Sequence, residues 1–578
     1  MYIDIVPNRS SPPAILLREG HRVGKKVRKR TLANLSGWPM DRVEALRRLL
    51  KGEPMVSAGR AFRVHRSLPH GHVQAILTAV RRLGLDELIG SRPSRQRDLV
   101  LAMVVQRLID PGSKLACTRS WHNTTLGQEL NVQGTRVEEL YEALDWLLAR
   151  QRRIEKKLAS RHLHEGALAL YDVTSSYYEG HCCPLARRGH NRDGKKNTLS
   201  IVYGLLTDRE GRPISVQVYP GDTGDPTTVP DQVDKLRNAF GLHRVVLVGD
   251  RGMLTETRIE QLRAYPQLGW ISALRSGAIR RLMAGGAIQM SLFDQRDLAE
   301  IVSPEFPGER LVVCFNPLLA EDRRRTRQEL LEATEGRLSK VQAEVARRTR
   351  QPMSKDQIGL KVGKVINRYK VSKHFTLKIE DGRLEWRRDE SSIAAEAALD
   401  GIYVVRTSES PEQLARDDVV RSYKLLGQVE QAFRALKGLE IRVRPIYHRL
   451  PNRVRGHILL CMLAYYLEWH LRRAWAPLLF DDEQLPQDRR QRHPVRPADG
   501  SNSAQEKKQT RRTADGLEVQ SFATLLASLG TLCRNTCSVE GLDEGHGGRA
   551  STFECLTEAT PLQARAMELL DVLPGSAQ

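Results

Sequence analysis

Three acidic residues stand where secondary-structure elements should bring them to one shared site. Asp172 and Asp250 each end a short, mostly apolar run with the length and composition of a buried strand. Each carboxylate is therefore expected at the carboxyl end of a strand or near its edge. Glu430 lies in a segment, residues 423–437, whose apolar residues recur at spacings of three and four, as in an amphipathic helix. Such a set suits metal-dependent chemistry on nucleic acid.

The chemistry follows from the ligands that divalent cations prefer. Hard cations such as Mg²⁺ take oxygen ligands and keep several waters, so a few converging carboxylates are enough to hold them. Two such ions about 4 Å apart can activate an attacking water or hydroxyl and stabilise the departing oxygen of a phosphoryl transfer. A long chain has many acids at strand ends and on helix surfaces, so each of the three is a weak indication alone. Together, their three contexts favour a metal site.

The segment that carries Glu430 also places two other polar residues at regular spacing. Tyr423, Glu430 and Lys437 are seven residues apart. On an α-helix this spacing drifts by only about 20° per step, so the three should line one stripe beside the apolar face. For Tyr423, packing in the core is an equally good interpretation.

These motifs resemble those of insertion-sequence DDE transposases of the insertion-sequence-four superfamily, in the group whose third motif reads Y-x2-R-x3-E-x6-K. Three of its four positions match, and Leu426 stands where the family usually carries arginine, which leaves that arginine's DNA contact unassigned. The segments around Asp172 and Asp250 resemble the first two motifs of the family. The resemblance covers residues 60–475, and its motifs are specific in combination.

The resemblance implies an α/β fold with an RNase H-like core, a mixed sheet flanked by helices and interrupted by a large insertion that is rich in β-structure. It implies that Asp172, Asp250 and Glu430 are the catalytic residues and the ligands of Mg²⁺, with Mn²⁺ as a substitute. The residues expected to contact DNA are Tyr423, Lys437, Arg251, Arg444, His448, Arg449 and Arg455.

Local patterns predict the elements that position these residues. Two strands around the polar turn at residues 208–213 should form a hairpin, followed by a helix near residues 229–240, another at 254–264 and a strand at 269–275. The core is expected to resume only at residue 401. Residues 319–350 indicate a long solvated helix, residues 374–388 a hairpin, and residues 481–516 a disordered linker. The predicted divisions are a mostly helical, DNA-binding region at 1–160, two core parts at 161–275 and 401–475, an insertion at 276–400, and a linker and tail at 476–578.

Composition narrows the class of partner. Lys and Arg number 91 against 69 acids among 578 residues, which gives a formal charge of +22 and favours a polyanion. Basic segments occur at residues 18–30 and 442–455, and each by itself could equally be a solvated face. The segment beside Glu430, residues 442–455, is the better candidate for DNA contact, because scissile DNA would have to pass there. No apolar stretch is long enough to span a membrane, no signal peptide is recognisable, and the eight Cys fit reduced thiols. We expect a cytoplasmic, nucleoid-associated protein of a prokaryotic cell.

The function expected from this reasoning is a transposase that binds double-stranded DNA at the ends of its element. It would cleave these ends and join the freed 3′ hydroxyl to target DNA, as a homodimer in a synaptic complex. Two alternatives stay open: a metal-dependent nuclease or resolvase on the same fold, and an inactive DNA-binding regulator derived from a transposase. A glycosidase with paired carboxylates is a distant third, disfavoured by the positive charge.

Overall fold

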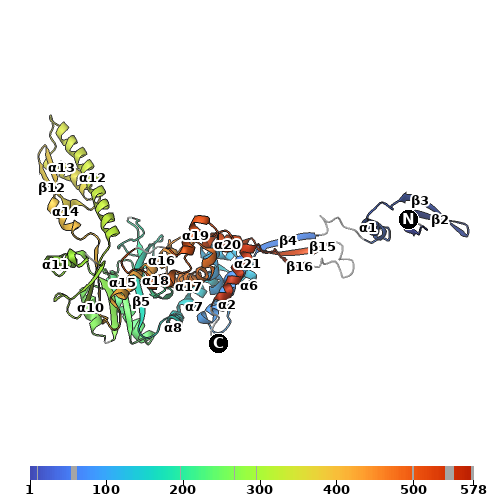
Figure 1. Cartoon of the computed structure of the whole chain (residues 1–578), viewed down its shortest axis with the longest axis horizontal. Coiled ribbons are helices and arrows are strands. Elements are labelled where there is room, and N and C mark those ends of the chain that lie inside the picture. The colour runs from blue at the N-terminus through green and yellow to red at the C-terminus, as the bar shows by residue number, and fades with distance from the viewer. Residues whose placement is uncertain are drawn as a thin grey trace. The chain divides into compact units, whose positions relative to one another are not determined.

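The structure is a computed structural model of the whole chain, and it divides into two compact units. One comprises Met1–Gly71 with Gly530–Ala559, and the other comprises His72–Leu529 with Thr560–Gln578 (Figure 1). The structure describes residues 1–9, 11–53, 62–195, 197–265, 267–293, 296–496, 500–539 and 552–573. Part of the predicted C-terminal tail lies outside these ranges.

The larger unit is built around a mixed sheet of eight strands. Their order in space is β10 (Leu298–Ile301), β11 (Arg310–Phe315), β14 (Ile402–Thr407), β9 (Leu268–Ala273), β8 (Val245–Gly249), β5 (Ala167–Tyr177), β6 (Ser200–Asp208) and β7 (Pro213–Pro220). β8 pairs in parallel with β5 and β9, and the other neighbours are antiparallel. Every residue of β6 and β8 is buried, because both faces of the sheet centre are covered. The predicted α/β fold with an RNase H-like core is confirmed.

The predicted hairpin of β6 and β7 and the strand β9 are present, but the sheet is larger than the sequence indicated. The expectation that the core resumes only at residue 401 is wrong, because β10 and β11 extend the sheet next to β14. Asp172 also does not end its strand. β5 continues to Tyr177, since β6 pairs with it along residues 169–177, beyond the point where β8 stops.

Helices α9 (Val229–Asp234) and α10 (Glu256–Arg263) flank β8 in the chain, and a π-helical turn, Lys235–Ala239, extends α9. α11 (Ser276–Ala284) follows β9. The segment that carries Glu430 is two helices, α15 (Arg416–Lys424) and α16 (Leu426–Lys437), so the prediction of one continuous helix is wrong. The helix tightens at Leu425, whose N–H bonds the carbonyl of Ser422, and the N–H of Gln428 in turn bonds Leu425, three residues back in both cases.

Helices precede the sheet in the chain, and the longest buried helix follows it. α17 (Pro451–Trp475) contacts α4, α7 and β7. α2 and α4 lie in the part of the chain that the sequence predicted to be mostly helical. Ser94 caps α4 by accepting a hydrogen bond from the N–H of Arg97. The helices of this region are α2 (Gly71–Arg82), α3 (Leu85–Ile89), α4 (Arg95–Ile109), α5 (Lys114–Ser120), α6 (Leu126–Glu129), α7 (Val137–Leu148) and α8 (Gln151–His162).

The predicted disordered linker contains two helices, α18 (Leu485–Gln491) and α19 (Asn502–Thr510), so that prediction is wrong. The polar composition of this segment suggested disorder, but Lys507 donates hydrogen bonds to the carbonyls of Ala476 and Asp481, earlier in the chain. α20 (Phe522–Gly530) follows this segment in the chain, and α21 (Pro561–Glu568) ends the described chain with a short 3₁₀ turn. Within the described residues, no helix is both long and apolar enough to cross a membrane.

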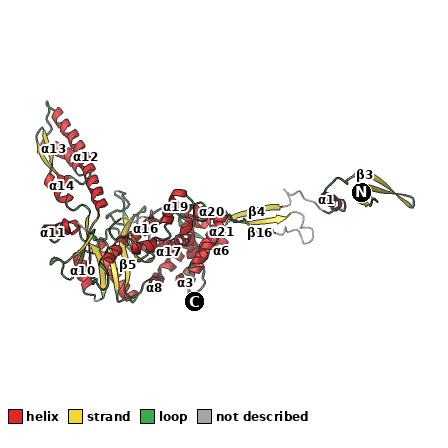
Figure 2. Cartoon of the chain, viewed as in Figure 1, coloured by secondary structure: helices red, strands yellow, loops and turns green. Residues whose placement is uncertain are grey.

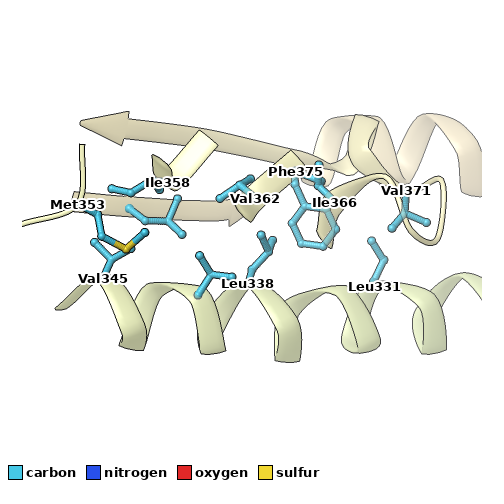
Figure 3. Close-up of a cluster of buried hydrophobic side chains, with 11 residues drawn as sticks. Leu331, Leu338, Val345, Met353, Ile358, Val362, Ile366, Val371 and Phe375 are labelled. Atoms are coloured by element: carbon cyan, nitrogen blue, oxygen red, sulfur yellow. The ribbon is translucent and has the colours of Figure 1, made fainter. Parts of the chain in front are cut away.

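The insertion between β11 and β14 has a hydrophobic core of its own. It consists of α12 (Pro317–Arg347), α13 (Lys355–Ile366), α14 (Glu390–Ala397) and the hairpin of β12 (Phe375–Glu380) and β13 (Arg383–Arg388). Figure 2 shows that helix dominates, so the expected β-rich insertion is wrong. α12 is not solvated all round, because buried residues spaced along one face, among them Leu331, Leu338 and Val345, point toward α13 and β12 (Figure 3).

The smaller unit is rich in β-structure, so the prediction that residues 1–160 are mostly helical fails at the N-terminus. β1 (Tyr2–Val6), β2 (Ala14–Val23) and β3 (Lys26–Asn34) form one antiparallel sheet, and α1 (Met40–Leu50) supplies Val43 to a small core with Ile15 and Leu35. A second sheet joins segments far apart in the sequence: β16 (Thr552–Leu556), β15 (Cys533–Val539) and β4 (Phe62–Pro69).

Candidate active site

The register of two parallel strands brings the first two acidic residues together. Tyr171 of β5 is paired with Gly249 of β8, so Asp172 and Asp250 follow the same paired position on neighbouring strands. Such strands lie about 4.8 Å apart. Asp172 is half-buried and its Oδ1 accepts a hydrogen bond of 2.7 Å from the N–H of Val173, while Asp250 is exposed directly after β8. The sequence therefore placed Asp250 correctly at a strand end.

The carboxyl of Asp172 is affected by the charges of the other two acids. Its pKa is raised to about 7, chiefly by burial and then by the negative charges of Asp250 and Glu430. The N–H of Val173 and the positive charge of Arg192 act in the opposite direction and lower the pKa. Without a further cation, a substantial fraction of this carboxyl is protonated near neutral pH.

Glu430 reaches this region from α16, which contacts β5 and β6. The apolar face of the helix is buried against the sheet, and the ring of Phe433 packs edge-on against Tyr203 of β6 at 5.9 Å between centroids. Glu430 itself is exposed. Leu426, which stands where the family usually carries arginine, is only 9% exposed, so this side chain contributes to packing.

Tyr423 joins the site from α15, on the other side of the break between the two helices. Its hydroxyl lies 3.4 Å from Oδ1 of Asp250, to which it can donate. Burial raises the pKa of Tyr423, as does the nearby charge of Asp250, so the hydroxyl keeps its proton. Packing alone does not account for this residue, since its polar end reaches an acid of the set.

Lys437 is tied to the strand that carries Asp172. Its Nζ donates to the carbonyl of Ser175 at 2.6 Å and to Oδ1 of Asp193 at 3.0 Å. The side chain of Asp193 is 1% exposed, and Arg444 forms a second ion pair with the same oxygen at 2.5 Å. Burial lowers the pKa of Lys437, while Asp193 opposes this shift. Both cations are thus occupied within the protein.

Sequence reasoning missed Asp193 and Arg192. They lie between β5 and β6 in a polar turn, and Arg192 forms an ion pair with Asp225. The N–H of Arg192 also bonds the hydroxyl of Ser175, which fixes the turn against β5. The sequence feature that could have indicated this turn is the cluster of hydrogen-bonding residues before Gly194, whose φ is +73°.

The remaining predicted DNA contacts differ in their surroundings. Arg251 and Arg449 are exposed, and Arg455 donates to Asn452 at 3.2 Å. His448 packs edge-on against Tyr141, with 6.0 Å between centroids, and burial lowers its pKa to about 3, helped by nearby positive charges. A neutral imidazole can reach a phosphate only through a hydrogen bond.

A divalent metal fits the chemistry of Asp172, Asp250 and Glu430. Their donor atoms are all carboxylate oxygens. Burial is the main cause of the raised pKa of Asp172, and the negative charges of Asp250 and Glu430, which also raise it, are ones that a cation would balance. In the described part of the chain, no three His, Cys, Asp or Glu side chains converge closely enough to enclose a metal. Mg²⁺ keeps several waters and shares substrate oxygens, so a complete protein cage is not required.

Two protein families match parts of the chain. Residues 166–467 match the family described as "Transposase DDE domain", and residues 3–59 match "IS1634 family transposase, N-terminal domain". No curated protein matches the chain. Among solved structures, the chain is similar to the cryo-EM structure of the piggyBac transposase synaptic complex with hairpin DNA, with 10% identity and a TM-score of 0.33, over 79% of this chain and 77% of that chain.

The first of these matches spans more than half of the chain and includes Asp172, Asp250 and Glu430. The predicted family is confirmed, and with it a polynucleotidyl transferase that requires a divalent metal. The protein belongs to the DDE transposases of insertion sequences.

Proposed function

We propose that this transposase cleaves the ends of its element and joins the 3′ hydroxyl to target DNA at a site formed by Asp172, Asp250 and Glu430. These residues would hold Mg²⁺, for which Mn²⁺ can substitute. The observation that carries the proposal is the pairing of β5 with β8, which sets Asp172 beside Asp250, together with the influence of Glu430 on Asp172. When bound, the metal would activate the attacking oxygen and stabilise the departing one.

The chain's own residues position these acids. Tyr423 donates to Asp250 and restrains its carboxylate, and the N–H of Val173 does the same for Asp172. Lys437 fastens the end of α16 to β5, so Glu430 is held by the helix that precedes this contact. Water and a 3′ hydroxyl can attack through the same geometry, so one site can serve both cleavage and joining.

We propose two roles for the basic residues around the site. Arg251, Arg449 and Arg455 are free enough to contact DNA phosphates, and His448 can add a neutral hydrogen bond. Lys437 and Arg444 act first through Asp193, whose buried charge they balance, and so fix the turn beside the acids. In this proposal Tyr423 contacts DNA as well as Asp250, because it is only half-buried.

The partners follow from the reaction. The chain would bind double-stranded DNA at element ends and at the target, and a homodimer would hold two ends together in a synaptic complex. We place this activity on chromosomal DNA in a prokaryotic cell. Residues 161–275 and 401–475 would supply the catalytic residues, the insertion would support bound DNA, and the region before residue 160 would recognise element ends.

The test is a Mg²⁺-dependent cleavage and strand-transfer assay on duplexes that carry the flanking element ends. Asp172→Ala, Asp250→Ala and Glu430→Ala should each abolish cleavage and joining while DNA binding persists. Glu142→Ala, an exposed acid of α7, is the matched control and should keep both activities. Cleavage without joining would indicate a nuclease, and activity in a triple variant would show that the acids are wrongly assigned.

A further inference from the structure

The hairpin of β2 and β3 extends well beyond the sheet to which it belongs. β1 pairs only with residues 14–18 of β2, whereas β2 and β3 continue to pair with each other as far as Val23 and Lys26. We call residues 19–30 the ribbon. Every residue from 20 to 30 is exposed, so the described structure gives the ribbon no apolar support.

The ribbon is strongly basic, and its register sorts the charges onto two faces. Paired residues share a face, so His21, Val23, Lys26, Arg28 and Arg30 lie on the same side, which we call the basic face. Residues 20–30 include no acid, and Glu19 lies opposite Arg30. Within the described residues, no ion pair involves Lys26, Arg28 or Arg30.

The opposite face is less free. It carries Gly20, Arg22, Val27 and Lys29. Lys29 lies 3.5 Å from the carboxylate of Asp4 and 5.9 Å over the ring of Tyr2. Its positive charge is partly balanced within the protein. The two faces therefore differ in the charge that they offer to a partner.

This arrangement is costly for the isolated chain. A two-stranded hairpin without a covered face is at best marginally stable in water. The cations of the ribbon also repel one another, since residues 20–30 include no acid that could balance them. A polyanion that neutralises the cations would remove this repulsion and order the ribbon. Charged residues also protect sheet edges from aggregation, but that role does not require Lys26, Arg28 and Arg30 to share one face.

We propose that the ribbon lies in the major groove of duplex DNA, with the basic face contacting phosphates. The major groove, about 12 Å wide, admits a two-stranded β-ribbon. At the tip, Val23 and Val27 are 56% and 62% exposed on either side of the turn at Gly24 and Lys25, and one of them can meet thymine methyl groups. The inference deepens the proposed function, on which it rests for the choice of DNA, by assigning duplex capture to a segment apart from the catalytic acids.

The magnitude follows from counterion release. Each phosphate contact contributes about 0.9 to the slope of log affinity against log salt concentration on B-form DNA. Loss of Lys26, Arg28 and Arg30 should therefore reduce the slope by about 2.7 if each side chain meets one phosphate. Between about 50 and 200 mM salt the affinity of this variant should consequently depend less on salt than that of the wild type.

The test measures fluorescence anisotropy of labelled duplexes with the full-length protein in EDTA. The charge-removal variant combines Lys26→Gln, Arg28→Gln and Arg30→Gln, and should show weaker binding and the lower slope. The control combines Lys508→Gln, Arg511→Gln and Arg512→Gln, at exposed positions in α19 and directly after it, with the same loss of charge, and should match the wild type. A charge-conserving variant, with Lys26→Arg, Arg28→Lys and Arg30→Lys, should retain the slope, which separates charge loss from misfolding.

Several outcomes would overturn the proposal. An unchanged slope in the charge-removal variant would show that the ribbon contacts no phosphates. An equal loss in the control at residues 508–512 would show a general effect of net charge. Equal or tighter binding of an RNA duplex, whose major groove is too narrow for the ribbon, would exclude the major-groove position.

The experiment also separates this proposal from the proposed function. Binding is measured without metal, so it does not depend on the catalytic acids. A wild type that cleaves and joins DNA, with a charge-removal variant that binds normally, would reject the ribbon alone. A ribbon variant with the lower slope, from a wild type that never cleaves, would reject the catalytic assignment alone.

Discussion

Replacing Asp172 by asparagine should stabilise the metal-free protein, and the gain should grow with pH. The pKa of this carboxyl rises from an ordinary value of 3.8 to about 7 on folding, chiefly through burial and then through the charges of Asp250 and Glu430. The folded state therefore binds the proton more tightly than the unfolded state. Ionising Asp172 costs the folded state nothing below about pH 3.8, and the full cost is present above about pH 7.

The magnitude follows from the shift. A displacement of about three pKa units corresponds to about 4 kcal/mol, at 1.36 kcal/mol per unit. Asparagine keeps an oxygen that can accept the hydrogen bond from Val173 but carries no charge. The stability of Asp172→Asn minus that of the wild type should therefore increase by about 4 kcal/mol between about pH 4 and pH 8.

The assay is urea unfolding of the full chain in EDTA, followed by tryptophan fluorescence at several pH values. Glu142→Gln, which changes an exposed acid on α7, is the control and should stay within about 0.5 kcal/mol of the wild type throughout. Saturating Mg²⁺, at about 100 times its dissociation constant, should add about 2.7 kcal/mol to the wild type and much less to Asp172→Asn. A difference between Asp172→Asn and wild type that is constant with pH would refute the reasoning, because it would mean that burial does not raise the pKa.

Three other predictions concern the framework around the site. Glu309→Ala should lower the free energy of unfolding in urea by about 3 to 5 kcal/mol, because it removes the buried carboxylate that Arg406 of β14 bonds at 2.6 Å. Glu305→Ala, which removes an exposed ion pair, should lower it by less than about 1 kcal/mol. Leu338→Ala should lower the opening free energy of the insertion, measured by hydrogen exchange, by about 2 to 5 kcal/mol. Leu360→Ala, at a position that is 70% exposed, should change this free energy by no more than about 0.5 kcal/mol. Equal effects of the two substitutions would show that α12 is not packed as described. Lys437→Met should cost about 3 to 5 kcal/mol, because it removes one of two cations from a buried carboxylate, and a loss of cleavage without any loss of stability would instead indicate direct contact with DNA.

The sequence by itself determined the strands of the core, the family and the three candidate acids. Apolar runs and turn residues are local signals, and β5 to β9 are short segments whose burial shows directly in their composition. The spacing that singled out Glu430 is also local, since a helix repeats its own faces. The break at Leu425 was invisible, because the apolar pattern continues through it.

Only the tertiary structure decided which segments meet. β11 joins the sheet by pairing with β14, about ninety residues further along the chain, across the whole insertion, and β10 pairs with β11. The pKa of Asp172 depends on burial and on the charges of Asp250, after β8, and Glu430, in α16. Lys437 forms its ion pair with Asp193, which lies in a turn far earlier in the sequence. The apolar periodicity of a segment indicates how much of that segment is buried. Strand pairing, electrostatics and buried ion pairs depend instead on which distant segment packs against it.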